Sequence, residues 1–523
     1  NEIMLILGNP SKDFLIISFM VLIVFVFVFK TAYLVLFNWF QARFIFNVQI
    51  SLSNKLFKGY MFQPYLFHVN RNSSSLIRNI VTEINTFASC STAMIILLSE
   101  TMVFLGISML LIIYEPIGSI MSISIFCISG FVFYSIFKNR MSYWGTERQK
   151  YDQKKIQYIQ EGIGGIKESK IYGKESNFIN QFNSQAVGSS EMGKRISFLS
   201  TFPRIFLELI IILIMSIFVV YLINYQYSYQ NIIAILGLFA VAAFRLLPSI
   251  NKIIGSIQLL RYNLPVVDLI YKEINSLKKF SVSSNNCAKF NFKNSLVIRD
   301  LSFSYDDKNN ILDDLSLDIK KGEKIGFIGE TGSGKSTLID IILGLLTPSK
   351  GSIIVDGVNI DSNIRGWQKN LGYVPQTIFL TDDTFMNNIA YGSKSNEIHE
   401  EKVINSLKAS QLYNFINSLE NKLKTKVGEK GIRLSGGQRQ RIGIARALYN
   451  SPEIIVFDEA TSALDYDTEN EVMKTINSLE DKTIIIIAHR INTLRDCDKI
   501  FELKYGKLVR KEFKDLEPKY KGK

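Results

Sequence analysis

Apolar residues follow different patterns in the two halves of the 523-residue chain. Up to about residue 270, Phe, Ile, Leu and Val form long runs, whereas the later residues alternate charged, polar and apolar positions as in a soluble α/β domain. A helix needs roughly 20 apolar residues to cross the hydrocarbon core. Five runs reach that length, at about 14–40, 91–113, 117–137, 203–223 and 231–251. Buried helices of a large soluble core rarely give so many such runs, so we predict a membrane domain.

The charges between the runs indicate their orientation, because cytoplasmic connections collect Lys and Arg. The segments 45–88 and 138–200 are rich in both, while the connection 224–230 carries no charge. We therefore expect the two basic segments inside the cell, and 224–230 and the N-terminus outside. Both internal connections are long, which predicts that the helices project beyond the bilayer into the cytosol.

Composition narrows the classes of protein. A net charge of +13 would suit nucleic-acid binding, but a basic chain with several apolar spans usually keeps its charges on cytoplasmic loops, and we expect no nucleic-acid partner. The four cysteines lie far apart without a CxxC spacing, which indicates neither a metal site nor a disulfide framework. The first apolar run is too long for a cleavable signal peptide and has no basic segment before it.

A stretch rich in Ser, Asn and Lys separates the halves, and we assign it as a linker at 276–295. The predicted domains are thus 1–275 in the membrane and 296–523 outside it. The first motif of the second domain is KIGFIGETGSGKSTLIDII, which predicts an apolar strand, a glycine turn and an amphipathic helix.

The glycine turn fits the G-x-x-x-x-G-K-[ST] pattern of a P-loop. Its glycines let backbone N–H groups close around phosphates at a helix N-terminus, Lys335 adds charge at the β- and γ-phosphates, and the Ser336 hydroxyl ligates Mg²⁺. A bare match can be a structural turn, but the strand before it and the helix after it favour a nucleotide site. The predicted phosphate-binding residues are Gly329, Glu330, Thr331, Gly332, Ser333, Gly334, Lys335, Ser336 and Thr337.

The segment EIIVFDEA supplies an apolar strand that ends in Asp458 and Glu459. In P-loop enzymes the carboxylate at such a strand end holds Mg²⁺, and a following carboxylate can polarise the attacking water. Without the P-loop, the pair would be two surface acids. With it, we predict Asp458 as a metal ligand and Glu459 as a catalytic residue.

Between these motifs lies LSGGQ, residues 434–438, and here the chain resembles the ABC-type ATPases. Small residues at this helix N-terminus suit close approach to a γ-phosphate, and the predicted contacts are Ser435, Gly436, Gly437 and Gln438. The combination of motifs covers essentially all of 296–515, and ATP and Mg²⁺ are the cofactors that the resemblance implies.

Other motifs of that family match in order. Tyr305 resembles the aromatic residue that stacks on adenine, and Gln376 resembles the glutamine that senses Mg²⁺ and faces the membrane domain. Asp465 ends SALD, which resembles the loop linking two ATP sites, and His489 resembles the switch histidine at the γ-phosphate. A lone Tyr, Gln or His is more often structural, and only the placement in matched motifs favours these roles.

The resemblance implies an all-α transmembrane domain of the type IV exporter fold, followed by an α/β P-loop ATPase. In this family the signature of one ATPase domain completes the ATP site of another, so it implies a homodimer, and Glu459 keeps both sites competent. Coupling helices are expected near 64–73 and 168–176, and VGEKG, residues 427–431, resembles the segment that touches membrane-domain loops. Exporter halves have six membrane helices. A sixth would precede residue 14, and because the chain lacks an initiator methionine we expect that it is truncated there.

Charges inside apolar spans are expensive and usually functional. They include Lys30, Arg204, Glu208 and Arg245. One interpretation is that Lys30 and Arg204 reach the interface and that Arg204 pairs with Glu208. The other is a basic cavity for an anionic head group. FPRIFLE and AFRLLPSINKII resemble the bacterial flippase of lipid-linked oligosaccharides for protein N-glycosylation, which implies a polyprenyl-pyrophosphate glycan moved from the inner to the outer leaflet.

Two alternatives stay open from the sequence. An exporter of drugs, lipids or peptides would make the same charges structural. A non-transporting ABC ATPase that acts on nucleic acid or ribosomes is opposed by the fused apolar spans. A soluble kinase or GTPase is excluded by LSGGQ and His489 together. We expect a multi-pass protein of the bacterial inner membrane with its ATPase domain in the cytoplasm.

Overall fold

The structure, a computed structural model, describes residues 12–114, 116–224, 229–277, 288–306, 309–460, 466–479, 482–488 and 490–520. For part of the helical residues in these ranges only the backbone is described. The chain divides into two compact units, one up to residue 281 without 64–66, and one comprising 64–66 and the residues from 282 onward. Each unit is described by itself.

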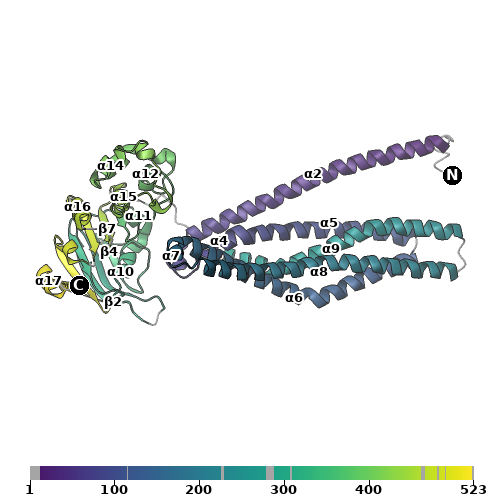
Figure 1. Cartoon of the computed structure of the whole chain (residues 1–523), viewed down its shortest axis with the longest axis horizontal. Coiled ribbons are helices and arrows are strands. Elements are labelled where there is room, and N and C mark those ends of the chain that lie inside the picture. Colours follow the sequence, from purple (N-terminus) through teal and green to yellow (C-terminus); the bar gives the residue numbers. More distant parts are fainter. Residues whose placement is uncertain are drawn as a thin grey trace. The chain divides into compact units, whose positions relative to one another are not determined.

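Among the residues that the structure describes, the regular elements of the first unit are all helices (Figure 1). Its elements are α2 (Lys12–Met61), α3 (Tyr65–Val69), which it shares with the second unit, α4 (Ser73–Arg78), the π-helix η1 (Asn79–Glu83), α5 (Ile84–Tyr114), α6 (Pro116–Gly164), α7 (Ile166–Ile171), α8 (Glu175–Asn224) and α9 (Tyr229–Leu277). At a rise of 1.5 Å per residue, the 50 residues of α2 extend about 75 Å, well beyond a hydrocarbon core of about 30 Å. The helix is thus long enough to extend beyond the bilayer, and its projection into the cytosol stays a prediction.

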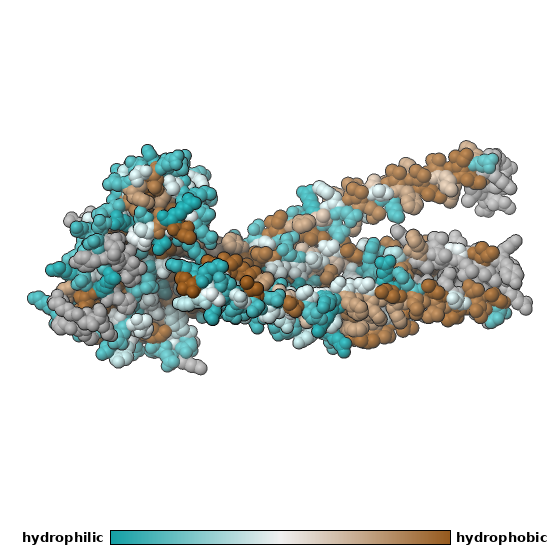
Figure 2. Space-filling view, viewed as in Figure 1, coloured by the Kyte–Doolittle hydropathy of each residue, from teal (hydrophilic) through white to brown (hydrophobic). Residues whose placement is uncertain are grey.

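All five predicted spans are helical, in α2, α5, α6, α8 and α9. Within the described part of the chain, three stretches are long and apolar enough to cross a membrane: Asp13–Met61, Ser73–Ile113 and Leu246–Leu277. The predicted spans at 117–137 and 203–223 lie in α6 and α8, where several side chains are outside the described set. Figure 2 shows apolar residues concentrated along the part of these helices away from α7.

The long helices pack unequally. α5, α6, α8 and α9 run together, whereas α2 diverges from them toward its N-terminal end (Figure 1). The C-terminal part of α2 is anchored by Leu56 and Tyr60, which are buried against Ile84 of α5 and Val266 and Ile270 of α9. The apolar window of α2 has none of its residues buried within the chain. Its sequence therefore suits contact with lipid or with further protein.

The second unit contains two β-sheets. One has the order β2-β1-β4-β5 and is antiparallel, and the other has the order β10-β9-β3-β8-β7-β6, with β10 alone antiparallel to its neighbour. The strands are β1 (Ser295–Phe303), β2 (Leu312–Lys320), β3 (Lys324–Ile328), β4 (Lys350–Val355), β5 (Val358–Asn359), β6 (Leu371–Val374), β7 (Ile454–Asp458), β8 (Thr483–Ile487), β9 (Lys499–Lys504) and β10 (Lys507–Lys511). The first four residues of β7 and all of β8 are buried, as expected for parallel strands covered on both faces.

Helices cover the larger sheet and extend beyond it. They are α10 (Lys335–Ile342), α11 (Ile364–Gln368), α12 (Phe385–Ile389), α13 (Glu400–Ala409), α14 (Tyr413–Asn417), α15 (Gly436–Leu448), α16 (Tyr466–Asn477) and α17 (Phe513–Tyr520). Short 3-10 turns are η2 (Ile360–Asn363), η3 (Ser395–Glu397), η4 (Lys422–Lys424), η5 (Glu429–Gly431) and η6 (Ile491–Leu494). α10 packs in one hydrophobic core with β1 and β2, while α15 packs in another with α12 and α13. An α-helical domain followed by an α/β domain is the predicted architecture.

Candidate functional site

The P-loop connects the buried strand β3 to α10. A Cβ atom on Gly329 would lie 2.4 Å from the Leu503 carbonyl oxygen of β9, so only glycine fits at the start of the loop. Gly334 caps α10 with a φ of +100°, a conformation that L side chains rarely adopt. The loop therefore has the backbone freedom and close packing that phosphate-binding turns need.

Lys335 is the first residue of α10 and points back over the loop. Its ammonium donates hydrogen bonds to the carbonyl oxygens of Gly329 and Glu330, both at 2.8 Å, and the residue is buried. Burial lowers the pKa of Lys335, while the carboxylates of Glu459 and Asp458 oppose that shift. A cation held in this loop, with Ser336 and Thr337 in the following helical turn, fits a polyphosphate.

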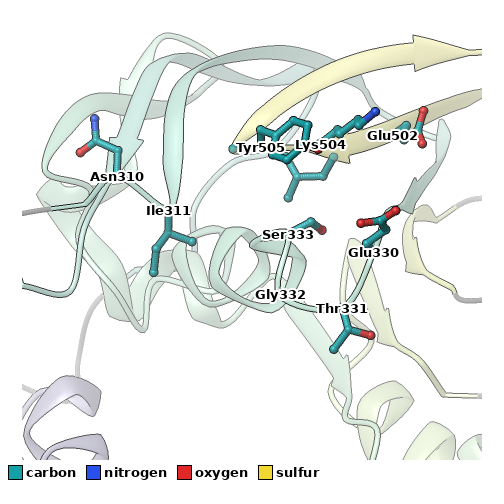
Figure 3. Close-up of a pocket in the computed structure, with 11 residues that line it drawn as sticks. Asn310, Ile311, Glu330, Thr331, Gly332, Ser333, Glu502, Lys504 and Tyr505 are labelled. Atoms are coloured by element: carbon teal, nitrogen blue, oxygen red, sulfur yellow. The ribbon is translucent and has the colours of Figure 1, made fainter.

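One side of the loop borders a cavity of about 340 Å³. Figure 3 shows the P-loop residues Glu330, Thr331 and Ser333 on one side of it, with Lys504 and Tyr505 of the β9–β10 turn on another. Asn310 and Ile311, which precede β2, complete the wall (Figure 3). The open side of the P-loop is thus lined by three separate segments of one domain.

Tyr305 follows β1 and lies near the P-loop helix. Its ring contacts Phe303 edge-on at a centroid distance of 4.9 Å, and its hydroxyl lies 3.5 Å from the Thr337 hydroxyl. The residue is 42% exposed, so it is accessible to a ligand. This places Tyr305 beside the P-loop helix, and its adenine-stacking role stays a prediction.

Asp458 ends β7 and is held by a residue that the sequence analysis missed. The Tyr373 hydroxyl of β6 donates to Asp458 Oδ2 at 3.2 Å. Burial raises the pKa of the Asp458 carboxyl, and the charge of Glu459 acts in the same direction. The hydrogen bond from Tyr373 and the charge of Lys335 partly oppose this shift. Asp340, one turn beyond Ser336 in α10, has its pKa raised to about 6 by burial and by the charge of Asp458. β6 lies beside β7 only through the sheet pairing, so nothing in the spacing predicted the Tyr373 contact.

Glu459 and Gln376, both predicted catalytic residues, are in contact. The Gln376 amide donates to Glu459 Oε2 at 2.7 Å. Glu459 has a φ of +48°, which is unusual for a residue other than glycine, and its N–H donates to the Ile487 carbonyl oxygen of β8. Two segments that are 83 residues apart therefore meet beside the strand that carries Asp458.

The signature motif forms the N-terminus of α15. The Ser435 hydroxyl accepts from the Gln438 N–H at 3.2 Å, and the Ser435 N–H donates to Gln438 Oε1 at 2.9 Å, which is a capping box. Gly436 and Gly437 occupy the first helical turn. A rigid cap with small residues leaves helix N–H groups available to an anion. This helix packs in the core that also contains Ile328, directly before the P-loop, whereas α10, after the P-loop, packs in the other core.

Two predicted residues, Asp465 and His489, lie outside the described residues. The expected coupling segments coincide with short helices, since α3 (Tyr65–Val69) lies within 64–73 and α7 (Ile166–Ile171) overlaps 168–176. The roles of these segments stay predictions.

The predicted substrate charges differ in their surroundings. Arg204 Nε lies 3.2 Å from Glu208 Oε1, with both side chains largely exposed. The Lys30 ammonium lies over the Phe27 ring at 5.1 Å. Arg245 is in α9, and its side chain is outside the described set. Glu100, inside the predicted run 91–113, is a further charge in the membrane domain that was not among the predicted substrate residues. Its position among apolar residues was a signal that could have identified it.

Comparisons with known proteins agree with this division of the chain. The family profile "ABC transporter transmembrane region" matches residues 2–246, and "ABC transporter" matches 312–462. An ATP-dependent lipid A-core flippase of Saccharophagus degradans is 30% identical over 492 residues, covering 90% of this chain and 80% of that protein. One of Francisella novicida is 43% identical over 217 residues, or 41% of this chain, and the matched part spans only 36% of that protein.

A solved structure shows the same fold. The bacterial Atm1-family ABC exporter with ATP bound superposes with a TM-score of 0.80 at 22% identity, covering 99% of this chain and 91% of that one. This likeness confirms the predicted exporter fold. The chain therefore belongs to the ABC transporter family, as a polypeptide in which one membrane domain precedes one ATPase domain.

Proposed function

We propose that the chain is half of a homodimeric, ATP-driven flippase of the bacterial inner membrane, which moves a polyprenyl-pyrophosphate-linked oligosaccharide from the inner to the outer leaflet. The observation that carries the proposal is the fusion of a P-loop site to long apolar helices that bear cations such as Lys30 and Arg204. Relatives named as lipid A-core flippases support a lipid as cargo.

In this proposal each part of ATP is assigned to residues whose chemistry suits it. The P-loop N–H groups and Lys335 bind the phosphates, and Tyr305 stacks on the adenine. Ser336, Gln376 and Asp458 would hold Mg²⁺, which when bound neutralises charge on the transferred phosphate. Glu459 accepts a proton from the attacking water, and Gln376 orients its carboxylate through the 2.7 Å hydrogen bond.

The homodimer rests on the resemblance to ABC-type ATPases, in which the signature motif of one ATPase domain completes the ATP site of another. Because this chain carries one P-loop and one LSGGQ motif, a second copy is the simplest source of a signature motif for each ATP site. ATP binding then closes the ATPase pair, the helices follow into an outward-facing arrangement, and hydrolysis resets the cycle. Lys30, Arg204 and Arg245 attract the pyrophosphate on the inner side.

Reconstitution with defined lipid-linked oligosaccharides tests this function by scoring ATPase stimulation and translocation together. Replacing Lys30, Arg204 or Arg245 by neutral residues should lower translocation, and normal translocation by all three variants would refute their role. A second candidate substrate, a lipid A-core glycolipid, is favoured by the names of the relatives and should be measured in parallel. Stimulation by apolar drugs alone would instead favour a drug exporter.

A further inference from the structure

A carboxylate inside the second predicted span is held across a helix interface. Glu100 of α5 places Oε1 at 2.6 Å from the Lys252 ammonium of α9, and its Oε2 accepts a hydrogen bond from the Ser249 hydroxyl at 2.7 Å. Both partners lie on α9, three residues apart. The two oxygens of one acid are therefore fixed by a neighbouring helix within an apolar segment.

The surroundings of this polar cluster are apolar. Its neighbours along α5 and α9 belong to a core of buried side chains, Leu111, Leu207, Leu246 and Ile250, with Phe104, Ile107 and Ile254 packed against it. Leu207 comes from α8, where it lies between Arg204 and Glu208 in sequence. The helix that carries the pair of Arg204 and Glu208 therefore packs into this core through Leu207. Charges inside apolar spans usually mark a pathway for polar groups.

The two partners of the first pair are unequally exposed. The Glu100 side chain is 16% exposed, whereas that of Lys252 is 58% exposed. Glu100 is anchored by Ser249, and Lys252 reaches it by a flexible four-carbon stem. The ammonium is the exposed member of the pair, so an incoming anion can reach it directly and a more highly charged anion can replace the carboxylate. The carboxylate would then keep its hydrogen bond to Ser249.

We infer that Glu100 is a resident counter-ion for Lys252, and that an incoming phosphorylated head group must displace it. The inference rests on the proposed function and adds a specificity residue to it. A pyrophosphate carries more charge than one carboxylate and forms stronger charge-assisted hydrogen bonds to an ammonium. A zwitterionic head group carries its own ammonium and competes poorly. Glu100 thereby sets the negative charge that a lipid needs to occupy Lys252.

The test uses the full chain in phosphatidylcholine vesicles and measures the concentration of undecaprenyl pyrophosphate that half-maximally stimulates ATP hydrolysis. Glu100→Gln frees Lys252 and should lower this concentration about threefold to tenfold, whereas Lys252→Ala should raise it by a similar factor. Undecaprenyl phosphate, with less charge, should stimulate Glu100→Gln more than the parent. The double variant should behave like Lys252→Ala, because the proposed effect of Glu100 on the head group acts through that ammonium.

A purely structural ion pair predicts a different pattern. Both single variants would then shift the half-maximal concentration in the same direction and melt at lower temperature, and that result would overturn the inference. Glu100→Asp provides a milder change, since it keeps a charge near Ser249 but retracts it from Lys252, and it should act in the direction of Glu100→Gln. Lys252→Arg should keep the parental response. Soluble pyrophosphate tests whether the ligand is a lipid or a free anion. If the ligand is a lipid, the half-maximal concentration should rise from Glu100→Gln through the parent to Lys252→Ala with undecaprenyl pyrophosphate and not with soluble pyrophosphate.

Failure of the inference is distinct from failure of the proposed function. If undecaprenyl pyrophosphate stimulates the parent and neither residue matters, the role of Glu100 is wrong and the flippase stands. If only diphosphorylated lipid A stimulates the parent, the proposed cargo is wrong, and the same variants test Glu100 with lipid A. If neither anionic lipid stimulates the parent, both proposals are overturned.

Discussion

Gly145 makes a close helix contact that a single added methyl group can probe. It lies in α6, where a Cβ atom would stand 1.8 Å from the Tyr262 carbonyl oxygen of α9 and 3.0 Å from its carbonyl carbon. Tyr262 is buried, and its ring receives the Arg148 guanidinium at 5.4 Å. Arg148 in turn pairs with the fully buried Glu83 at 3.4 Å. Gly145→Ala therefore perturbs the contact that positions a buried ionic cluster.

The structure sets the size of this effect. Real Cβ contacts essentially never fall below 3.0 Å, so the two helices must separate locally by roughly 1.2 Å. The atom in the way belongs to the backbone and cannot rotate away. Overpacking of this kind costs about 1–3 kcal/mol, against which alanine in a helix interior recovers about 0.5–1 kcal/mol. We expect a net loss of about 1–2 kcal/mol.

Gly130→Ala is the matched control, because Gly130 lies in the same helix and, among the described residues, no neighbouring side chain or backbone atom comes within 4 Å of the place where the alanine methyl group would lie. It should be neutral or stabilising by about 0.5–1 kcal/mol. The measurement is the apparent melting temperature of the purified chain in one detergent at fixed protein concentration. Gly145→Ala should melt several degrees lower than the parent and Gly130→Ala should not. Equal melting of all three proteins would refute the close approach of α6 and α9.

Three further predictions concern the ATPase domain. Glu459→Gln should keep ATP binding, because glutamine can retain the contact with Gln376, yet lose about 10²- to 10⁴-fold in phosphate release, and a rate within tenfold of the parent would contradict its role as proton acceptor. Ser435→Ala removes the cap of α15 and should lower hydrolysis about tenfold, while Ser435→Thr restores a cap and most of the rate. The pKa of Asp340 is raised to about 6, so its ionisation as pH rises from about 4 to 6 lowers the stability of the nucleotide-free domain. The free energy of unfolding of Asp340→Asn should therefore exceed that of the parent at pH 7 by on the order of 1–2 kcal/mol, measured by denaturant unfolding, and the difference should shrink toward pH 4. A constant difference between pH 4 and pH 7 would disprove the raised pKa of Asp340.

The local parts of the ATP site were predictable because contiguous residues build them. The P-loop needs glycines and Lys335 within one turn, and the cap of α15 needs Ser435 and Gln438 three residues apart, so the spacing alone indicates both. The contacts of Tyr373 with Asp458 and of Gln376 with Glu459 join segments more than 80 residues apart. They exist only because parallel strands place their carboxyl ends at one edge of the sheet.

The same distinction holds in the membrane domain. Runs of apolar residues determined that long helices form, because a helix satisfies its own backbone hydrogen bonds in hydrocarbon, but they did not show where each helix begins, since α8 starts at Glu175 and its apolar run at about 203. The sequence also showed that Arg204 and Glu208 are one helical turn apart, and the structure pairs them. What the sequence could not decide is which helices touch. Glu100 and Lys252 are 152 residues apart, and only the packing of α5 against α9 brings the acid to the ammonium. Helix formation follows from local composition, whereas the choice of ion-pair partner depends on how the helices pack.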